Sequence, residues 1–159
     1  MLKLHTPLIL LLALFLSFQV QAQPKAVKKL PDFSFFTLNG DVFTSNQVKY
    51  DNYLMVAYFD PDCDHCNEQA AKIKENIGKL KNVTMIWISF GESEAIAKFQ
   101  KTYFDGIKRF TFLQDPNMKI FTYFPDAVET PTVYLYDKNK TQIGKFVEEE
   151  VQNIYQFIQ

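Results

Sequence analysis

The chain has 159 residues and a formal net charge of -1, with acidic and basic residues interspersed. This balance gives no indication of a nucleic acid or an anionic membrane surface as a partner. Hydrophobic residues make up 47% of the chain and aromatic residues 16%, which excludes a disordered protein and suits one domain with a single core.

The first 22 residues have the pattern of a signal peptide. Lys3 precedes an apolar or small run over residues 8–18, which is too short to span a bilayer, and Val20, Gln21 and Ala22 follow it. We predict cleavage after Ala22 and an exported protein of the periplasm or cell envelope, with no stable membrane span after cleavage. The alternative is an uncleaved amino-terminal anchor.

Residues 23–31 contain lysines and two prolines with little apolar periodicity, and are expected to form a flexible leader. The domain is expected over residues 32–159. Its first element is a predicted hairpin of strands 33–37 and 41–44, because Asn39 and Gly40 form a strong two-residue turn signal between them.

Two strand–helix units follow. The apolar run 54–59 predicts a central strand covered on both faces, and Ala70, Ile73, Ile77 and Leu80 mark one face of a helix of about five turns. Residues 83–90 predict a second buried strand, followed by an amphipathic helix capped by Ser93. The alternation predicts a largely parallel sheet.

The last third combines short strands and turns. Strand 110–114, a turn at 115–116 and a one- or two-turn helix over 118–124 precede a hairpin of strands 133–136 and 142–147. A final helix is expected to present Val147, Val151, Ile154, Tyr155 and Ile158 on one face.

The only two cysteines, Cys63 and Cys66, form a C-x-x-C pair between a buried strand and an amphipathic helix. A loop this short makes a poor stabilising disulfide. Zinc needs about four Cys or His ligands, and His65 is the only histidine left after signal cleavage, so we expect no metal and no cofactor. The pattern indicates a redox pair, with Cys66 as the resolving thiol.

The groups near the sulfur of Cys63 have opposite effects on the stability of its thiolate. A helix amino terminus and a protonated His65 favour a thiolate at Cys63, whereas Asp60, Asp62 and Asp64 oppose one. We therefore expect Asp62, Asp64 and His65 to modulate the pair.

The strand-turn-C-x-x-C-helix unit, the Asp115-Pro116 turn and the Thr130-Pro131-Thr132 segment together resemble the exported TlpA and ResA proteins of the AhpC/TSA superfamily. The resemblance covers roughly residues 31–158. It implies a thioredoxin-like three-layer α/β sandwich with an amino-terminal β-hairpin, in which Pro131 is a cis-proline facing Cys63 and Cys66. It also implies that Thr130 offers its backbone to protein thiol or disulfide substrates, and that an unidentified redox partner exists.

The sequence departs from that family pattern near the cysteines. Asp62 and Phe59 stand where tryptophans are common, and Ala57 stands where thioredoxin keeps a buried aspartate. Gln69 replaces a frequent glutamate, and the neighbouring Glu68 lies roughly 100 degrees away around a helix. The acid-base partner of Cys66 is thus left unassigned.

Three functions remain open from the sequence. The first is a thiol-disulfide oxidoreductase, with reduction favoured by the resemblance; the second is a redox-inactive binding module on the same fold. The third, a peroxidase, is disfavoured because Asp60 and Val56 occupy the places of the Thr or Ser and the proline that peroxiredoxins need.

Overall fold

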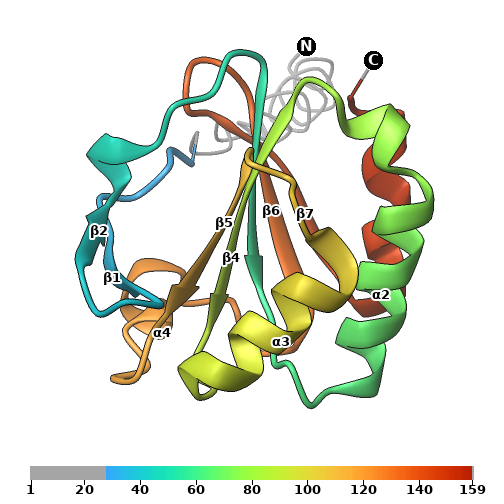
Figure 1. Cartoon of the computed structure of the whole chain (residues 1–159). Helices are drawn as coiled ribbons and strands as arrows, with labels where there is room; N and C mark the ends of the chain where they lie inside the picture. Colours follow the sequence, from blue (N-terminus) through green and yellow to red (C-terminus); the bar gives the residue numbers. More distant parts are fainter. Residues whose placement is uncertain (1–27, 159) are drawn as a thin grey trace, which may run out of the picture.

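Seven strands form one mixed sheet in the computed structural model, which describes residues 28–158 (Figure 1). The predicted signal peptide and residues 23–27 of the leader lie outside the described residues. The sheet order is β2-β1-β5-β4-β3-β6-β7. The strands are β1 (Ser34–Thr37), β2 (Val42–Thr44), β3 (Tyr53–Tyr58), β4 (Val83–Ser89), β5 (Phe110–Gln114), β6 (Thr132–Tyr136) and β7 (Gln142–Val147).

Only the central strands β3, β4 and β5 run parallel, so the expectation of a largely parallel sheet was wrong. If β6 were parallel to β3, the chain would have to cross back over the full length of the sheet between β5 and β6. The only helix between β5 and β6 is α4 (Ile120–Tyr123), whose four residues span about 6 Å. The chain stays at the edge where β5 ends, and β6 starts there antiparallel to β3.

The amino-terminal hairpin is confirmed, although its loop contains three residues, 38–40, and not the two that the turn signal predicts. β1 and β2 pair antiparallel, and the Gly40 amide donates to the Thr37 carbonyl at 2.9 Å. Gly40 has φ +89°, a conformation that glycine adopts without steric cost. A short 3-10 helix, η1 (Ser45–Gln47), follows the hairpin.

Both faces of the sheet are covered, which confirms the three-layer sandwich. Met55, Ala57 and Phe59 face a core closed by α2 (Asp64–Glu75), α3 (Ser93–Phe104) and η3 (Glu148–Gln156). Leu54, Val56 and Tyr58 face a second core, closed by α4 and the segments before β1 and β3. The uninterrupted apolar run of β3 thus reflects burial of both of its faces.

Three helix predictions need correction. The α2 helix ends at Glu75, with Asn76 as its C-cap, and is followed by the 3-10 helix η2 (Ile77–Leu80), so it is shorter than the expected five turns. The final element is also 3-10: its buried residues Val151 and Ile154 are three positions apart, which matches three residues per turn. Ser93 is the first residue of α3, not its cap, and its hydroxyl donates to Gln114 at 2.9 Å.

Backbone hydrogen bonds already join the described chain to the sheet at Lys29, within the segment expected to be flexible. Lys29 forms an isolated bridge with Thr141, and the Leu30 amide donates to the Lys140 carbonyl at 2.9 Å. The Leu30 side chain packs into the second core. Among residues 28–158, no helix has both the length and the apolar composition to cross a bilayer.

Phe59 links the sheet to the C-x-x-C segment and is fully buried. Its ring centroid lies 4.6 Å from that of Phe99 and 5.3 Å from that of Trp87. We expect Phe59→Ala to lower the free energy of unfolding by about 3–5 kcal/mol, because it removes a buried aromatic ring and leaves a cavity. Urea unfolding measures this loss. The control Phe157→Ala, at a side chain that is 45% exposed, should lose much less.

Candidate functional site

The segment between β3 and α2 forms a tight turn over residues 60–63, here called the reactive turn. The Cys63 amide donates to the Asp60 carbonyl at 3.2 Å, and the Asp62 amide donates to Asp60 Oδ1 at 2.9 Å. Asp in the first position and Pro61 in the second are the residues such a turn favours, since aspartate bonds the backbone two residues on and proline presets φ. The turn brings Cys63 to the start of α2.

Cys63 is the N-cap residue of α2, with φ -82° and ψ 124°. Its Sγ accepts the Cys66 amide at 3.4 Å, in the place where a capping oxygen usually satisfies a free helix amide. The side chain is partly exposed. In the thiol form, Sγ also lies within donating distance of the Thr130 carbonyl, at 3.7 Å. The first sulfur therefore combines solvent access with a backbone amide that stabilises negative charge.

Cys66 lies behind Cys63 and is fully buried in the core under α2. Burial raises the pKa of the Cys66 thiol to about 12, because a thiolate there would be desolvated. The Asp60 amide, 3.5 Å from Sγ, acts in the opposite direction, and hydrogen bonding with Cys63 raises the pKa further. Ala57 packs in the same core and supplies no carboxyl group beneath the pair.

The loop before β6 faces the cysteines. The Thr130–Pro131 peptide bond is cis, as the resemblance implied. The Pro131 carbonyl accepts the Glu148 amide at 2.8 Å, and the Thr132 hydroxyl donates to the Glu129 carbonyl at 2.6 Å. These bonds hold the loop so that the Thr130 carbonyl points at Cys63.

The other predicted site residues lie on the exposed rim of the turn. Asp62, Asp64 and His65 are all exposed. His65 Nδ1 lies 3.7 Å from Glu148 Oε1, which is an ion pair only when the imidazole is protonated. No local pattern predicts this contact, since 83 positions separate the two residues.

Gln69, which replaces the family's frequent glutamate, and its neighbour Glu68 differ in their surroundings. Glu68 is exposed to solvent. Gln69 is buried and accepts a hydrogen bond from Gln152 Nε2 of η3 at 2.7 Å. Gln69 therefore fastens η3 to α2, and neither residue makes a contact with Cys66 that would mark it as the acid-base partner.

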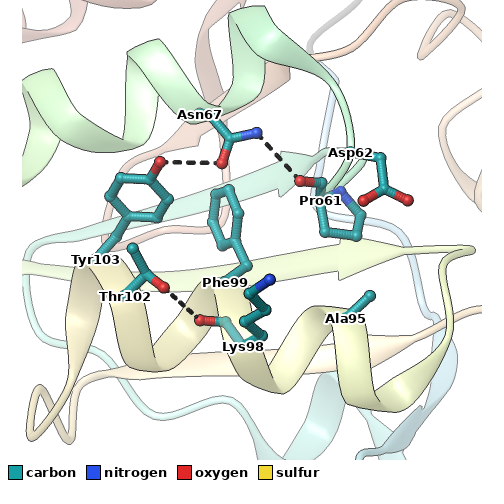
Figure 2. Close-up of a pocket in the computed structure, with 8 residues that line it drawn as sticks. All are labelled: Pro61, Asp62, Asn67, Ala95, Lys98, Phe99, Thr102 and Tyr103. Carbon is teal, nitrogen blue, oxygen red and sulfur yellow. Dashed lines mark hydrogen bonds between the residues drawn. The ribbon is translucent and has the colours of Figure 1, made fainter.

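Two residues of the site, Asn67 and Tyr103, were not predicted from the sequence. Asn67 contacts the reactive turn, and Tyr103 contacts Asn67. Asn67 donates to the Pro61 carbonyl and accepts the hydroxyl of Tyr103 from α3 (Figure 2). It also donates to the Cys63 carbonyl. Asn67 lies four positions after Cys63, and that spacing could have placed it beside the turn. No sequence signal could have supplied Tyr103, 36 residues further on.

Gly91, in the loop between β4 and α3, allows a close approach to the reactive turn. A Cβ atom at this position would lie 3.1 Å from Pro61 Cγ and 3.3 Å from Ser89 Oγ. Within the described part of the chain, no group of three or more His, Cys, Asp and Glu side chains could hold a metal ion.

Several solved structures have a similar fold. A thioredoxin-like protein from Aeropyrum pernix superposes with a TM-score of 0.67 at 17% identity, covering 80% of this chain and 88% of that one. A thiol-disulfide oxidoreductase from Bacteroides fragilis gives 0.64 at 19%, covering 82% and 98%. A secreted Mycobacterium tuberculosis disulfide oxidoreductase homologous to DsbE of E. coli gives 0.63 at 18%, covering 79% and 93%.

These identities establish the fold alone, and a search of curated proteins found no match. The family follows from the sequence: the model of the AhpC/TSA family matches residues 26–143. That range contains the reactive turn, both cysteines and the cis-proline loop. The chain belongs to the AhpC/TSA family and has the fold of a thioredoxin-like oxidoreductase.

Proposed function

We propose that this protein is an exported thiol-disulfide oxidoreductase that reduces disulfides in protein substrates through Cys63 and Cys66. The observation that carries the proposal is the placement of the two sulfurs. Cys63 is partly exposed at the start of α2, and Cys66 is buried directly behind it within hydrogen-bonding contact. An accessible attacking sulfur with a second thiol behind it suits two successive exchange steps through a mixed disulfide.

In the first step the Cys63 thiolate attacks one sulfur of a substrate disulfide. The substrate S–S bond breaks, a mixed disulfide with Cys63 forms, and the other substrate sulfur leaves as a thiolate. The Cys66 amide stabilises the attacking sulfur at 3.4 Å, and the Thr130 carbonyl faces the position that the bound substrate chain would occupy.

In the second step Cys66 resolves the mixed disulfide. Cys66 transfers its proton to the departed substrate thiolate and attacks Cys63 Sγ, forming the Cys63–Cys66 disulfide. The second substrate sulfur leaves and takes up the proton that Cys63 lost on activation. The substrate gains two electrons and two protons, and the protein dithiol loses both. The Asp60 amide, 3.5 Å from Cys66 Sγ, stabilises charge as it develops there.

The resemblance to the TlpA and ResA proteins favours reduction as the direction of exchange. We infer a reductase whose oxidised pair is returned to the dithiol by a partner that carries a dithiol of its own. The segment over residues 1–22 supports a location in the periplasm or cell envelope.

Replacing either cysteine separates the two steps. Cys63→Ser should abolish reduction of insulin disulfides, because no attacking sulfur remains. Cys66→Ser should also lose turnover but accumulate a mixed disulfide with the substrate, which non-reducing electrophoresis detects and dithiothreitol releases. Full activity in the Cys63→Ser protein would refute the proposal.

The reduction potential separates the reductase from a redox-inactive binding module. If the protein is a reductase, the reduction potential of the Cys63–Cys66 pair, measured in glutathione or thioredoxin buffers, should lie above about -300 mV. It should be nearer to the value of about -270 mV of thioredoxin than to the value of about -120 mV of a strong oxidant. A potential below about -300 mV, with slow alkylation of the reduced thiols, would favour the binding module. Rapid consumption of hydroperoxide by the reduced protein would favour the peroxidase.

The buried environment of Cys66 predicts a specific pH dependence. Because desolvation penalises the charged thiolate, the pKa of Cys66 is raised to about 12, and the thiol stays protonated across the neutral range. In the Cys63→Ser protein, thiolate absorbance at 240 nm should therefore stay flat from pH 7 to about pH 10. The Cys63→Ser/Cys66→Ser protein supplies the tyrosine background. A thiolate signal that develops between pH 7 and pH 9 would contradict the assignment of Cys66 as the buried resolving thiol.

A further inference from the structure

We propose that Asn67, held by Tyr103, is a positioning residue that fixes the reactive turn and thereby sets the reactivity of Cys63. The inference rests on the proposed function only in assigning Cys63 as the attacking sulfur. It is carried by three hydrogen bonds that join α2, the reactive turn and α3. Figure 2 shows the two that involve Pro61 and Tyr103.

The Asn67 side chain spans the reactive turn from inside the first turn of α2. Its Nδ2 donates to the Pro61 carbonyl at 3.1 Å and to the Cys63 carbonyl at 2.9 Å. The Cys63 carbonyl also accepts the Asn67 backbone amide at 3.1 Å. One amide group thus binds the carbonyls on both sides of Asp62, immediately before the sulfur that is proposed to react.

The orientation of this amide is determined by chemistry. Carbonyl oxygens only accept hydrogen bonds, so the nitrogen of the Asn67 amide must face Pro61 and Cys63. Its oxygen then points toward α3, where it accepts the Tyr103 hydroxyl at 3.0 Å. The Tyr103 ring is itself packed, with its centroid 4.9 Å from that of Phe99. The Tyr103 hydroxyl thus satisfies the amide oxygen that the turn leaves free, and it holds the Asn67 side chain from α3.

The position of Cys63 Sγ depends on the backbone that Asn67 holds. Sγ must stay close to the Cys66 amide, at 3.4 Å, and to the Thr130 carbonyl, at 3.7 Å. Without the Asn67 amide, the peptide between Pro61 and Asp62 loses the donor that fixes its orientation. The N-cap then loosens, and the Cys66 amide stabilises the attacking thiolate less well. A displacement of 1 Å at a reacting group can cost about 100-fold in rate.

Loss of this bond should cost little stability, because the site opens to solvent. Asn67 and Tyr103 line a pocket of about 260 Å³ between α2 and α3, together with Pro61, Asp62, Lys98 and Thr102 (Figure 2). Water can enter this pocket and hydrate the carbonyls that a shortened side chain would leave free. The effect on reactivity can therefore be measured separately from the effect on folding.

The test compares Asn67→Ala, Tyr103→Phe and the double variant in the full chain. The reduced proteins are treated with iodoacetamide from pH 6 to pH 10, and Cys63 alkylation is followed by mass spectrometry, with thermal unfolding as the folding check. Asn67→Ala should slow alkylation at pH 7 by about tenfold and move the midpoint of the pH profile upward. Tyr103→Phe should act in the same direction by a smaller factor.

The double variant should be no slower than Asn67→Ala, because Tyr103 acts through Asn67 and the two effects are coupled. Two matched controls should leave the alkylation profile unchanged. Asn76→Ala removes an asparagine at the other end of α2, whose side chain donates to the Lys72 carbonyl at 2.9 Å. Tyr155→Phe removes a tyrosine hydroxyl that is buried without a hydrogen-bond partner.

An alkylation rate and pH midpoint in Asn67→Ala equal to those of the unmodified protein would overturn the proposal, as would fully additive effects in the double variant. If Asn67→Ala failed to fold, an unchanged profile in Tyr103→Phe would overturn it instead. Alkylation needs no protein substrate, so the result is independent of insulin reduction. Failure of the unmodified protein to reduce disulfides would refute the proposed function and leave the role of Asn67 measurable.

Discussion

The site depends on the hydrogen bond from the Cys66 amide to the sulfur of Cys63. Four amides at the start of any helix lack an intrahelical partner, and here a sulfur satisfies one of them. The same contact ends the reactive turn, starts α2 and orients the exposed sulfur over the buried one. Cys63 thus has a structural role as the N-cap and a chemical role as the proposed nucleophile.

The topology of the sheet brings the remaining parts of the site to that point. The strands β3, β4 and β5 are parallel and end at one edge, and β6 begins at the same edge because it runs antiparallel to β3 (Figure 1). The reactive turn follows β3, Gly91 follows β4, and the cis-proline loop precedes β6. These three segments therefore lie together at one edge although they are far apart in the sequence. The two cores pack against the sheet from its two faces and support this edge.

Patterns that depend on near neighbours were sufficient to predict much of this structure. The Asn39-Gly40 turn, the apolar run of β3 and the position of Cys63 at a helix start all follow from residues a few positions apart. The predictions that were wrong concern features that depend on packing between distant segments. The 3-10 form of η3 cannot be told from an α-helix when Val151 and Ile154 satisfy both repeats, and the Ser93 hydroxyl prefers Gln114 of β5 to a capping bond. The bond from Tyr103 to Asn67 belongs to the same class, since two helices must pack before it exists.

The bridge between Lys29 and Thr141 sets the place where the described chain joins the sheet. Thr141 follows the turn between β6 and β7, and β6 begins at the cis-proline loop, so the bridge lies at the end of the sheet opposite the cysteines (Figure 1). The backbone at Lys28–Leu30 is therefore anchored far from Cys63. Within residues 28–158, this anchor leaves the edge that carries Cys63 to the reactive turn, the Gly91 loop and the cis-proline loop.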